Sequence, residues 1–247
     1  MKFFVPFFSM IILFISTESN SKLIKIDNFY IQDSEVTISE FLFYLKKNKK
    51  KTKAQIKGGS YRWGAGWELK KKWSYLSPFG KKASFNLPAV HITWSEARSY
   101  CQFLGGDLPT KKQWKKAAYT QILKNQSKSS NFKKGRIYPY PSGEKAEEMN
   151  LDWEKDKFIG LSPVKSFKPG INDLYDMGGN AWEWGLDKRG KERITLGASF
   201  WYGPEKTKES GFQFKDKDFH VVYIGFRCVF TSLLKNNLQK KVYKSMK

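Results

Sequence analysis

The segment LYDMGGNAWEW, residues 174–184, constrains the fold of this chain more than any other stretch. Two tryptophans flank Glu183, and a Gly-Gly-Asn corner follows shortly after Asp176. Two carboxylates are unusual in a core strand, and large aromatic rings are unusual in a loose loop. The segment therefore predicts a tightly packed turn that holds something through oxygen atoms. The alternative is a capped turn in which the carboxylates only accept hydrogen bonds.

The N-terminus predicts an export signal. Lys2 precedes an apolar run over residues 3–15, and residues 19–21 offer a small-residue cleavage site. We therefore expect a signal peptide over 1–21 and an exported chain, either periplasmic or secreted. The alternative is a membrane anchor, but the run is shorter than the ~20 residues that span a bilayer. We expect no transmembrane anchor after cleavage.

The formal charge of +22 comes mainly from lysine. Arginine, which forks onto phosphates and base edges, is rare. The arginines are Arg62, Arg98, Arg136, Arg189, Arg193 and Arg227. A solvated lysine surface is the simplest interpretation, and a weak association with an anionic surface is the alternative. We expect no nucleic-acid partner.

The chain has two cysteines, Cys101 and Cys228. In an exported protein they are a candidate disulfide, and the alternative is two buried free thiols. A bridge between them would close a loop of more than 100 residues. Such a bridge is worth about 4–5 kcal/mol in the chain-entropy description.

Three helix starts carry one signal, a threonine N-cap followed three residues later by Glu or Gln. This capping box begins at Thr37, Thr93 and Thr110. It predicts helices over about 38–47, from 94 to the Gly105-Gly106 stop, and from 111 onward.

The other segments are less regular. A strand is predicted near residues 25–32, and a short apolar strand that contains His91 ends at Thr93. The predicted loops are a basic loop over 46–53, an aromatic and glycine-rich loop over 58–68, and a polar insertion over 124–148. From 150 to 230 we expect mostly turns. The basic tail, 232–247, is either an amphipathic helix or a frayed terminus.

Six motifs in order give the chain a family resemblance. They are EVT followed by Phe41 (35–41), PAVHITWSEARSYC (88–101), LPT followed by Trp114 and Ala117 (108–117), LYDMGGNAWEW (174–184), RITLGASF (193–200) and GFRC (225–228). Each is weak alone, but their order resembles the sulfatase-modifying factor family, the family of formylglycine-generating enzymes. The resemblance covers roughly residues 25–230.

The resemblance implies the fold. Members of this family form a single irregular α+β domain of the C-type lectin type, here expected over residues 22–231. Such a domain has few regular elements, and calcium and a disulfide hold it together. Cys101 and Cys228 match the positions that the family joins, so the resemblance favours the bridge over two free thiols.

The resemblance also implies two calcium sites, since family enzymes hold two calcium ions with side-chain and backbone oxygens. One set falls on Asp176, Gly179, Ala181 and Glu183. The other set falls on Asn150, Leu151, Asp156 and Phe158. Asn150 and Asp156 would contribute side chains, while Gly179 and Ala181 would contribute carbonyl oxygens.

The oxidase chemistry of the family is not expected here. A formylglycine-generating enzyme holds copper with two further cysteines after its GGS-aromatic segment. Those positions fall on Tyr202 and Thr207, so we expect no catalytic residue and no copper. A related branch uses iron and a histidine cluster, but this chain has only His91 and His220. His91 is expected to be a core residue.

Aromatic residues in loop segments are the remaining candidates for a binding site. We expect a cleft lined by Trp63, Trp67, Trp182, Trp201 and Tyr202. The alternative is that these rings are ordinary core. The sequence thus predicts an exported domain without the oxidase cysteines that binds a protein or glycan partner. The alternative is a family enzyme, such as a formylglycine-generating oxidoreductase, with a rearranged active site.

Overall fold

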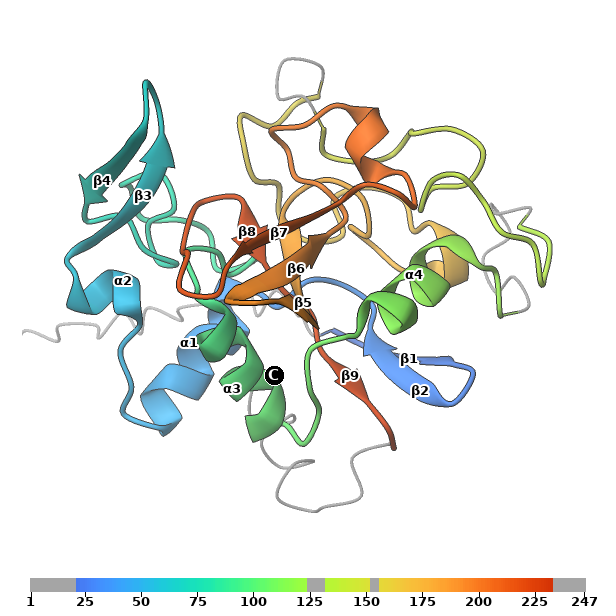
Figure 1. Ribbon diagram of the computed structural model, residues 1–247, viewed down its shortest axis with the longest axis horizontal. Coiled ribbons are helices and arrows are strands. Elements are labelled where there is room, and N and C mark those ends of the chain that lie inside the picture. Colours follow the sequence, from blue (N-terminus) through green and yellow to red (C-terminus); the bar gives the residue numbers. More distant parts are fainter. Residues whose placement is uncertain (1–20, 124–131, 152–155, 233–247) are drawn as a thin grey trace, which may run out of the picture.

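The computed structural model describes residues 21–123, 132–151 and 156–232. The basic tail and all but the last residue of the predicted signal peptide lie outside these residues, as does part of the polar insertion. In the described part, every helix is too short or too polar to cross a membrane. Helices and sheets form a mixed α+β arrangement around a shared core (Figure 1).

The three predicted helices are present with their predicted caps. They are α1 (Ile38–Lys47), α3 (Trp94–Phe103) and α4 (Lys111–Tyr119). In each, the threonine side chain accepts the N3 amide hydrogen, and the N3 side chain accepts the amide hydrogen of the threonine. Each helix buries one face, so local capping and amphipathicity were sufficient to locate them.

A fourth capping box was missed. Thr52 and Gln55 start the short helix α2 (Lys53–Ile56), which begins at the last residue of the predicted basic loop over 46–53. Lysines around Thr52 hide the pattern, because a helix of one turn has almost no apolar period. The amide of Lys53 also donates to the Glu96 carboxylate of α3 over 2.6 Å, so α2 is tied to the main body.

The central sheet has four strands in the order β7-β6-β5-β8 (Figure 1). These are β5 (Trp182–Arg189), β6 (Glu192–Leu196), β7 (Phe212–Asp216) and β8 (Ile224–Gly225). Strand β8 runs parallel to β5, and the other pairs are antiparallel. Trp182, Glu183 and Trp184 are all buried because β5 is a central strand covered on both faces.

Glu183 therefore lies in a core strand, and the turn predicted over 174–184 ends at Ala181. Turns do dominate the described residues between α4 and β5, where the regular element is the short 3₁₀ helix η1 (Ile171–Asp173). A second 3₁₀ helix, η2 (Pro204–Thr207), follows β6.

Two hairpins replace simpler predictions. The strand expected near 25–32 is a hairpin of β1 (Leu23–Ile26) and β2 (Phe29–Gln32), and β2 also pairs with β9 (Val229–Phe230). Asp27 in the turn between them has φ 58°, which acidic and amide residues tolerate better than most. The loop expected over 58–68 is a hairpin of β3 (Gly59–Trp63) and β4 (Trp67–Lys71).

The apolar segment before Thr93 is buried but is not a strand. His91 has φ 58°, which a strand cannot contain. Its amide donates to the carbonyl of Val221, whereas that of Ala89 donates to Val36. The segment thus forms backbone hydrogen bonds with two different segments of the chain. Its residues are apolar because they are buried, and not because they belong to a sheet.

A disulfide joins α3 to the segment between β8 and β9. Cys101 and Cys228 are bonded, with their Cα atoms 5.4 Å apart and a sequence separation of 127. Phe41, Tyr100 and Phe226 pack edge to face or tilted around this part of the core. The predicted bridge is confirmed, and no free cysteine remains in the chain.

Candidate functional site

Glu183 meets an arginine in the core. Nε of Arg227 lies 2.8 Å from each carboxylate oxygen, and Nη2 lies 2.7 Å from Oε1. Nε1 of Trp114 donates to Oε2 over 2.7 Å. All three side chains are buried. These charge-assisted contacts occupy the four lone-pair sites that a carboxylate offers.

Two more carboxylates lie near this pair. Glu35 is fully buried, and it accepts hydrogen bonds from the amide of Ala181 over 3.0 Å and from Nδ2 of Asn180 over 2.7 Å. Asp176 accepts the amide hydrogen of Lys165 over 2.8 Å. Backbone donors thus hold both acids at the corner predicted from residues 174–184.

We call Glu35, Asp176, Glu183 and Arg227 the carboxylate cluster. If all are ionised, three carboxylates and one guanidinium leave a net charge of −2, from 3 − 1. Burial raises the pKa of Glu35 well above its usual value, and the charges of Asp176 and Glu183 raise it further. Burial likewise raises the pKa of Asp176 to about 6. The raised pKa values show that one arginine does not balance three carboxylates, so a proton or a bound cation must balance the remaining charge.

The first predicted calcium set fits this corner only in part. The excess charge suits a hard cation, and Asp176 stands beside the turn that holds Gly179 and Ala181. Glu183, however, has its oxygens occupied by Arg227 and Trp114. Calcium bound to Glu183 would have to displace one of these donors.

The second predicted set offers open oxygens. Oδ1 of Asn150 and Oδ2 of Asp156 are both buried and have no hydrogen-bond partner within the described residues. The other side-chain atoms are engaged, because Nδ2 of Asn150 donates to the Gly160 carbonyl over 2.8 Å and Oδ1 of Asp156 accepts the Phe158 amide over 2.6 Å. Buried oxygens left without donors fit a cation.

We call Asn150, Leu151, Asp156 and Phe158 the Asn150 corner. Calcium there would supply a charge that joins two turns through their oxygens. Over residues 21–123, 132–151 and 156–232, no group of three or more His, Cys, Asp or Glu is arranged around a metal position. A calcium site here would therefore depend on amide and backbone oxygens together with Asp156.

The two corners touch through the Gly-Gly-Asn turn. The amide of Asn180 donates to the carbonyl of Asn150 over 2.9 Å. A Cβ on Gly179 would lie 2.2 Å from that same carbonyl oxygen, and Gly179 has φ +82°. Glycine is required at this position by both the close approach and the backbone angle.

An open pocket of about 270 Å³ lies between hairpin β3–β4, the segment after β6, strand β7 and the residue before β8. It is lined by Trp63, Trp67, Trp201, Tyr202, Lys215 and Tyr223, which we call the aromatic pocket. Four of the five predicted cleft residues meet here. The fifth, Trp182, is fully buried, and its ring contacts Tyr202 at 5.4 Å between centroids.

The rings of the aromatic pocket are not ordinary core. Trp63, Trp67 and Trp201 leave 49%, 44% and 43% of their surface exposed. Burial raises the pKa of Tyr223 and lowers the pKa of Lys215, so both polar groups lie at a partly dehydrated wall. The alternative of ordinary core applies to Trp182 alone.

The positions of the missing cysteine pair differ in setting. Tyr202 lines the aromatic pocket, whereas Thr207 is buried in η2 and donates its hydroxyl to the Pro204 carbonyl over 2.7 Å. Tyr119 donates its hydroxyl to the Thr207 carbonyl over 2.7 Å. Neither residue carries a thiol, so the pair cannot bind soft copper.

The two histidines meet at one serine. Oγ of Ser60 lies 2.7 Å from Nδ1 of His91 and 2.8 Å from Nδ1 of His220, and all three residues are buried. Nε2 of His91 lies 2.9 Å from the Pro78 carbonyl, so this nitrogen carries hydrogen and Nδ1 accepts from Ser60. We call Ser60, His91 and His220 the histidine relay.

The histidine relay is electrically neutral. Burial lowers the pKa of His91 to about 3 and that of His220 to about 4. Ser60, His91 and His220 are each 0% exposed and none of them lines the aromatic pocket, so the relay is not open to a substrate. His91 is thus the core residue that the sequence predicted, and the relay joins hairpin β3–β4 to the body.

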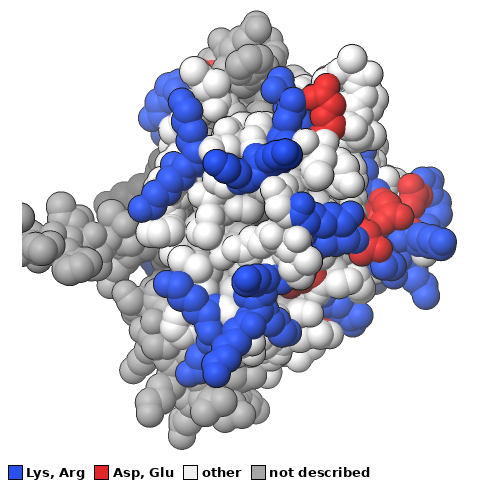
Figure 2. Space-filling model, turned by 90° about the vertical axis from the view of Figure 1, so that its left-hand side faces the viewer, with Lys and Arg blue, Asp and Glu red and all other residues white. Residues whose placement is uncertain are grey.

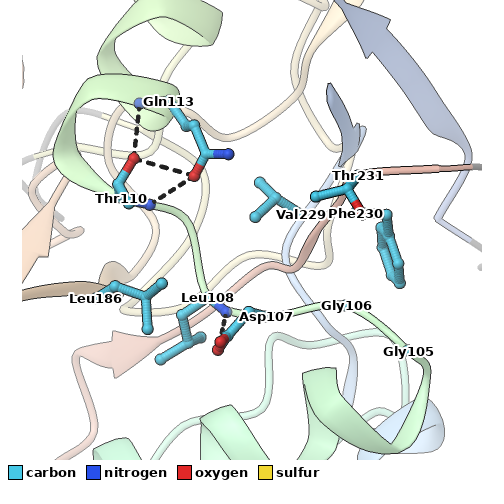
Figure 3. Close-up of a pocket in the computed structure, with 10 residues that line it drawn as sticks. All are labelled: Gly105, Gly106, Asp107, Leu108, Thr110, Gln113, Leu186, Val229, Phe230 and Thr231. Atoms are coloured by element: carbon cyan, nitrogen blue, oxygen red, sulfur yellow. Dashed lines mark hydrogen bonds between the residues drawn. The ribbon is translucent and has the colours of Figure 1, made fainter. Parts of the chain in front are cut away.

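A second cavity, of about 350 Å³, lies between the end of α3 and the start of α4 (Figure 3). Its polar wall atoms bond to one another. Thr110 and Gln113 form their capping box, and Asp107 accepts the amide hydrogen of Leu108 over 2.8 Å. The aromatic pocket, in contrast, has three tryptophans that are each more than 40% exposed, so it is the better candidate site.

Several site residues were missed from the sequence. Glu35 and Arg227 stand inside the EVT and GFRC motifs, so their position in motifs was a usable indication. Trp114 likewise stands in the LPT motif. Lys215 and Tyr223 lie in no motif that we singled out, and only the sheet order brings them beside Trp201.

The fold and the site define a class of protein, a single C-type-lectin-like α+β domain with one disulfide and no free thiol. A family model described as the sulfatase-modifying factor enzyme 1-like domain matches residues 11–232. The chain therefore belongs to the sulfatase-modifying factor family, as its six motifs predicted.

Relatives in this family differ in activity. "Inactive C-alpha-formylglycine-generating enzyme 2" of Mus musculus is 29% identical over 200 residues, which cover 68% of this chain and 60% of that protein. "Formylglycine-generating enzyme" of Bos taurus is 24% identical over 222 residues, which cover 74% of this chain and 59% of that protein. The chain thus spans about three fifths of the length of these relatives.

Solved structures share the fold at low identity. PvdO from Pseudomonas aeruginosa has a TM-score of 0.59 and 16% identity, covering 81% of this chain and 79% of that one. CarF has a TM-score of 0.55 and 20% identity, covering 82% and 85%. These matches confirm the predicted α+β fold of the formylglycine-generating enzyme type.

Proposed function

We propose that the chain is an exported, non-catalytic member of its family that binds a protein or glycan partner through the aromatic pocket. The observation that carries this is the pocket itself. Tyr202 lines it where the family enzymes carry a copper-binding cysteine. The chain's two cysteines are bonded to each other, and a disulfide sulfur is not a thiolate.

The aromatic pocket suits a ligand with flat apolar faces and an acidic group. Trp63 and Trp67 stand edge to face at 5.0 Å, and Trp201 exposes part of its ring beside them. Such surfaces pack on sugar rings or on peptide side chains. Lys215 adds one cation at the wall, which favours a carboxylate-bearing partner.

Export is part of the proposal. Disulfides persist in oxidising compartments such as the periplasm or the exterior, and the bond between Cys101 and Cys228 supports such a location. The apolar run at residues 3–15 supports it from the sequence. We further propose that the Asn150 corner binds calcium, because two of its buried oxygens have no donor.

The catalytic half of the proposal is tested by mass spectrometry. A sulfatase-type cysteine peptide is incubated with the purified protein, copper and a reductant. We expect no formylglycine, because Tyr202 and Thr207 supply no thiolate pair to hold copper. Protein-dependent loss of the cysteine sulfur, with an aldehyde in its place, would instead support an enzyme with a rearranged active site.

The binding half is tested on arrays of glycans and peptides. For ligands found there, Trp201→Ala should weaken binding at least about tenfold, since exposed rings in a pocket are typical anchors. Phe79→Ala is the matched control, because Phe79 is 42% exposed but lies outside the aromatic pocket. Ligands that bind wild type and Trp201→Ala equally well would contradict this site.

A further inference from the structure

Positive charge gathers between Lys46 and Lys82. This stretch covers the end of α1, α2 and hairpin β3–β4, and Glu68 is its single acidic residue. Its basic residues are Lys46, Lys47, Lys49, Lys50, Lys51, Lys53, Lys57, Arg62, Lys70, Lys71, Lys72, Lys81 and Lys82. Figure 2 views the side of the molecule where β3, β4 and α2 lie, and most charged side chains visible there are basic.

Little of this charge is neutralised within the protein. Among the described residues, the ion pairs in this stretch are Lys53 with Asp218 at 3.0 Å and Lys70 with Glu68 at 2.6 Å. Most of the lysines are exposed. The surface therefore has a strong positive field that a partner could balance.

Apolar side chains are exposed in the same stretch and, at Phe85, just after it. Ile56 exposes 73% of its surface, and Leu69, Phe79 and Phe85 are also exposed large hydrophobic residues. Single exposed apolar residues need no explanation, but their concentration among lysines does. We call the basic residues from 46 to 82, together with these four apolar residues, the basic face.

The basic face also contains an apolar pocket of about 440 Å³. Leu42, Leu76 and Phe85 form its walls, and Lys46 and Lys82 contribute to its lining. The pocket thus places an apolar surface directly beside two ammonium groups. This combination matches a molecule with an acyl part and an anionic head.

We propose that the basic face binds the surface of an anionic lipid bilayer. A polyanion in water would satisfy the lysines but would leave Ile56, Leu69, Phe79 and Phe85 without a partner. A bilayer interface offers both phosphates and an apolar layer. Lysine carries a point charge on a flexible side chain, which suits mobile lipid headgroups. Arginine is the residue that binds a phosphate through two parallel hydrogen bonds, and Arg62 is the only arginine between residues 46 and 82.

The charge contribution is tested with phosphatidylglycerol-containing vesicles against vesicles of phosphatidylcholine alone, by co-sedimentation of the full chain. Lys51→Glu, Lys71→Glu and Lys82→Glu together should lower the partition coefficient at least about tenfold. The control triple variant is Lys25→Glu, Lys134→Glu and Lys145→Glu. These exposed lysines belong to β1 and to segment 132–151, which lie on the side of the molecule opposite α2 and hairpin β3–β4 in Figure 1. This variant changes the net charge equally and should lower binding less than about threefold.

The apolar contribution has its own matched pair. Ile56→Ser with Phe85→Ser should weaken binding that persists at high salt, because salt screens the lysines but not the apolar contacts. Ile137→Ser with Ile159→Ser changes two residues that are at least as exposed on average, at 69% and 84% against 73% and 46%, and should not weaken it. Every variant retains residues 1–21, so differences between variants report on the basic face.

Three results would overturn the proposal. These are equal losses in the two triple variants, no preference for anionic vesicles, and binding to heparin without binding to vesicles, which would identify an acidic polysaccharide. The inference is independent of the proposed function. Trp201→Ala should leave vesicle binding unchanged, and the lysine variants should leave array binding to the aromatic pocket unchanged.

Discussion

The carboxylate cluster and the histidine relay are both polar groups in the core, but they are stabilised differently. The carboxylate cluster is ionic, and Glu183 depends on the guanidinium of Arg227 and on Nε1 of Trp114. The histidine relay is neutral, because one hydroxyl of Ser60 lies between two uncharged imidazoles. Neutral relays avoid the large desolvation cost of ions, whereas ionic clusters must replace lost water with several donors.

Both clusters join segments that are distant in sequence. Ser60 meets His220 across 160 residues, and Asn180 meets Glu35 across 145. The two clusters should therefore be sensitive to different changes. The carboxylate cluster should respond to the loss of its arginine and to added cations, while the histidine relay should respond to pH.

The largest effect is expected from Arg227→Leu. Removing the guanidinium leaves Glu183 buried with only the Trp114 donor and no cation, which costs about 3–5 kcal/mol of unfolding free energy. Chemical denaturation measures this. Arg98→Leu is the matched control, since the pair of Arg98 with Asp107 is partly exposed and should be worth about 0–1 kcal/mol.

A double variant sharpens this prediction. Arg227→Leu with Glu183→Leu should recover part of the stability lost by Arg227→Leu, because two apolar residues leave no buried charge. If the double variant is less stable than the single one by the full cost of a second cavity, the charge is not what makes Arg227 important. Far-ultraviolet circular dichroism of each variant shows whether it folds.

The next effect is expected from calcium. A cation that binds only the folded state adds about 2.7 kcal/mol at a free concentration one hundred times its Kd. We expect a chelator to lower the melting temperature and added calcium to restore it. Asp156→Asn should remove more of this sensitivity than Asp176→Asn, because the Asn150 corner has open oxygens.

The control for calcium is Asp216→Asn, an exposed acid of β7 that belongs to neither predicted set. A melting temperature that ignores both chelator and calcium would count against both sites. A greater loss from Asp176→Asn would mean that the carboxylate cluster takes the ion after its donors rearrange.

The smallest effect is expected from pH. Since burial lowers the pKa of His220 to about 4, the unfolded chain binds its proton first as pH falls below about 6.5. Stability is therefore fully present above pH 6.5 and falls by about 2 kcal/mol between pH 6.5 and 4.5 for this group. His220→Asn can keep a donor near Ser60 but does not titrate.

The comparison of wild type with His220→Asn isolates the histidine, because both proteins share every other titrating group. The variant should lose less stability than wild type over this pH range. Identical slopes in the two proteins would show that His220 is already open to protons in the folded state.

Local chemistry was enough to predict α1, α3 and α4, whereas the one-turn helix α2 was missed. Thr37, Thr93 and Thr110 each satisfy the first free amides of a helix from within four residues, so no distant contact is needed. The disulfide and the fold class were predicted through the ordered motifs, whose positions in the chain are a sequence property.

The strands were harder to predict. Hairpin β3–β4 reads as a loop because Gly59, Gly64 and Gly66 interrupt its pattern, and β5 pairs in parallel with β8 from about 40 residues away. The buried segment at His91 was predicted as a strand, because a buried segment is rich in apolar residues whether or not it pairs in a sheet. Only partners supplied by other segments distinguish the two.

The sequence by itself determined α1, α3 and α4, whose stabilising groups are neighbours in the chain, and it placed Tyr202 and Thr207 where the family enzymes carry their cysteine pair. The tertiary structure alone decided that Glu183 meets Arg227 rather than an open coordination position, and that Lys215 and Tyr223 join the tryptophans. The physical reason is the distance along the chain between the groups that interact. A cap is complete within one turn of chain, whereas a buried charge or a pocket wall is defined by whichever distant segment packs against it.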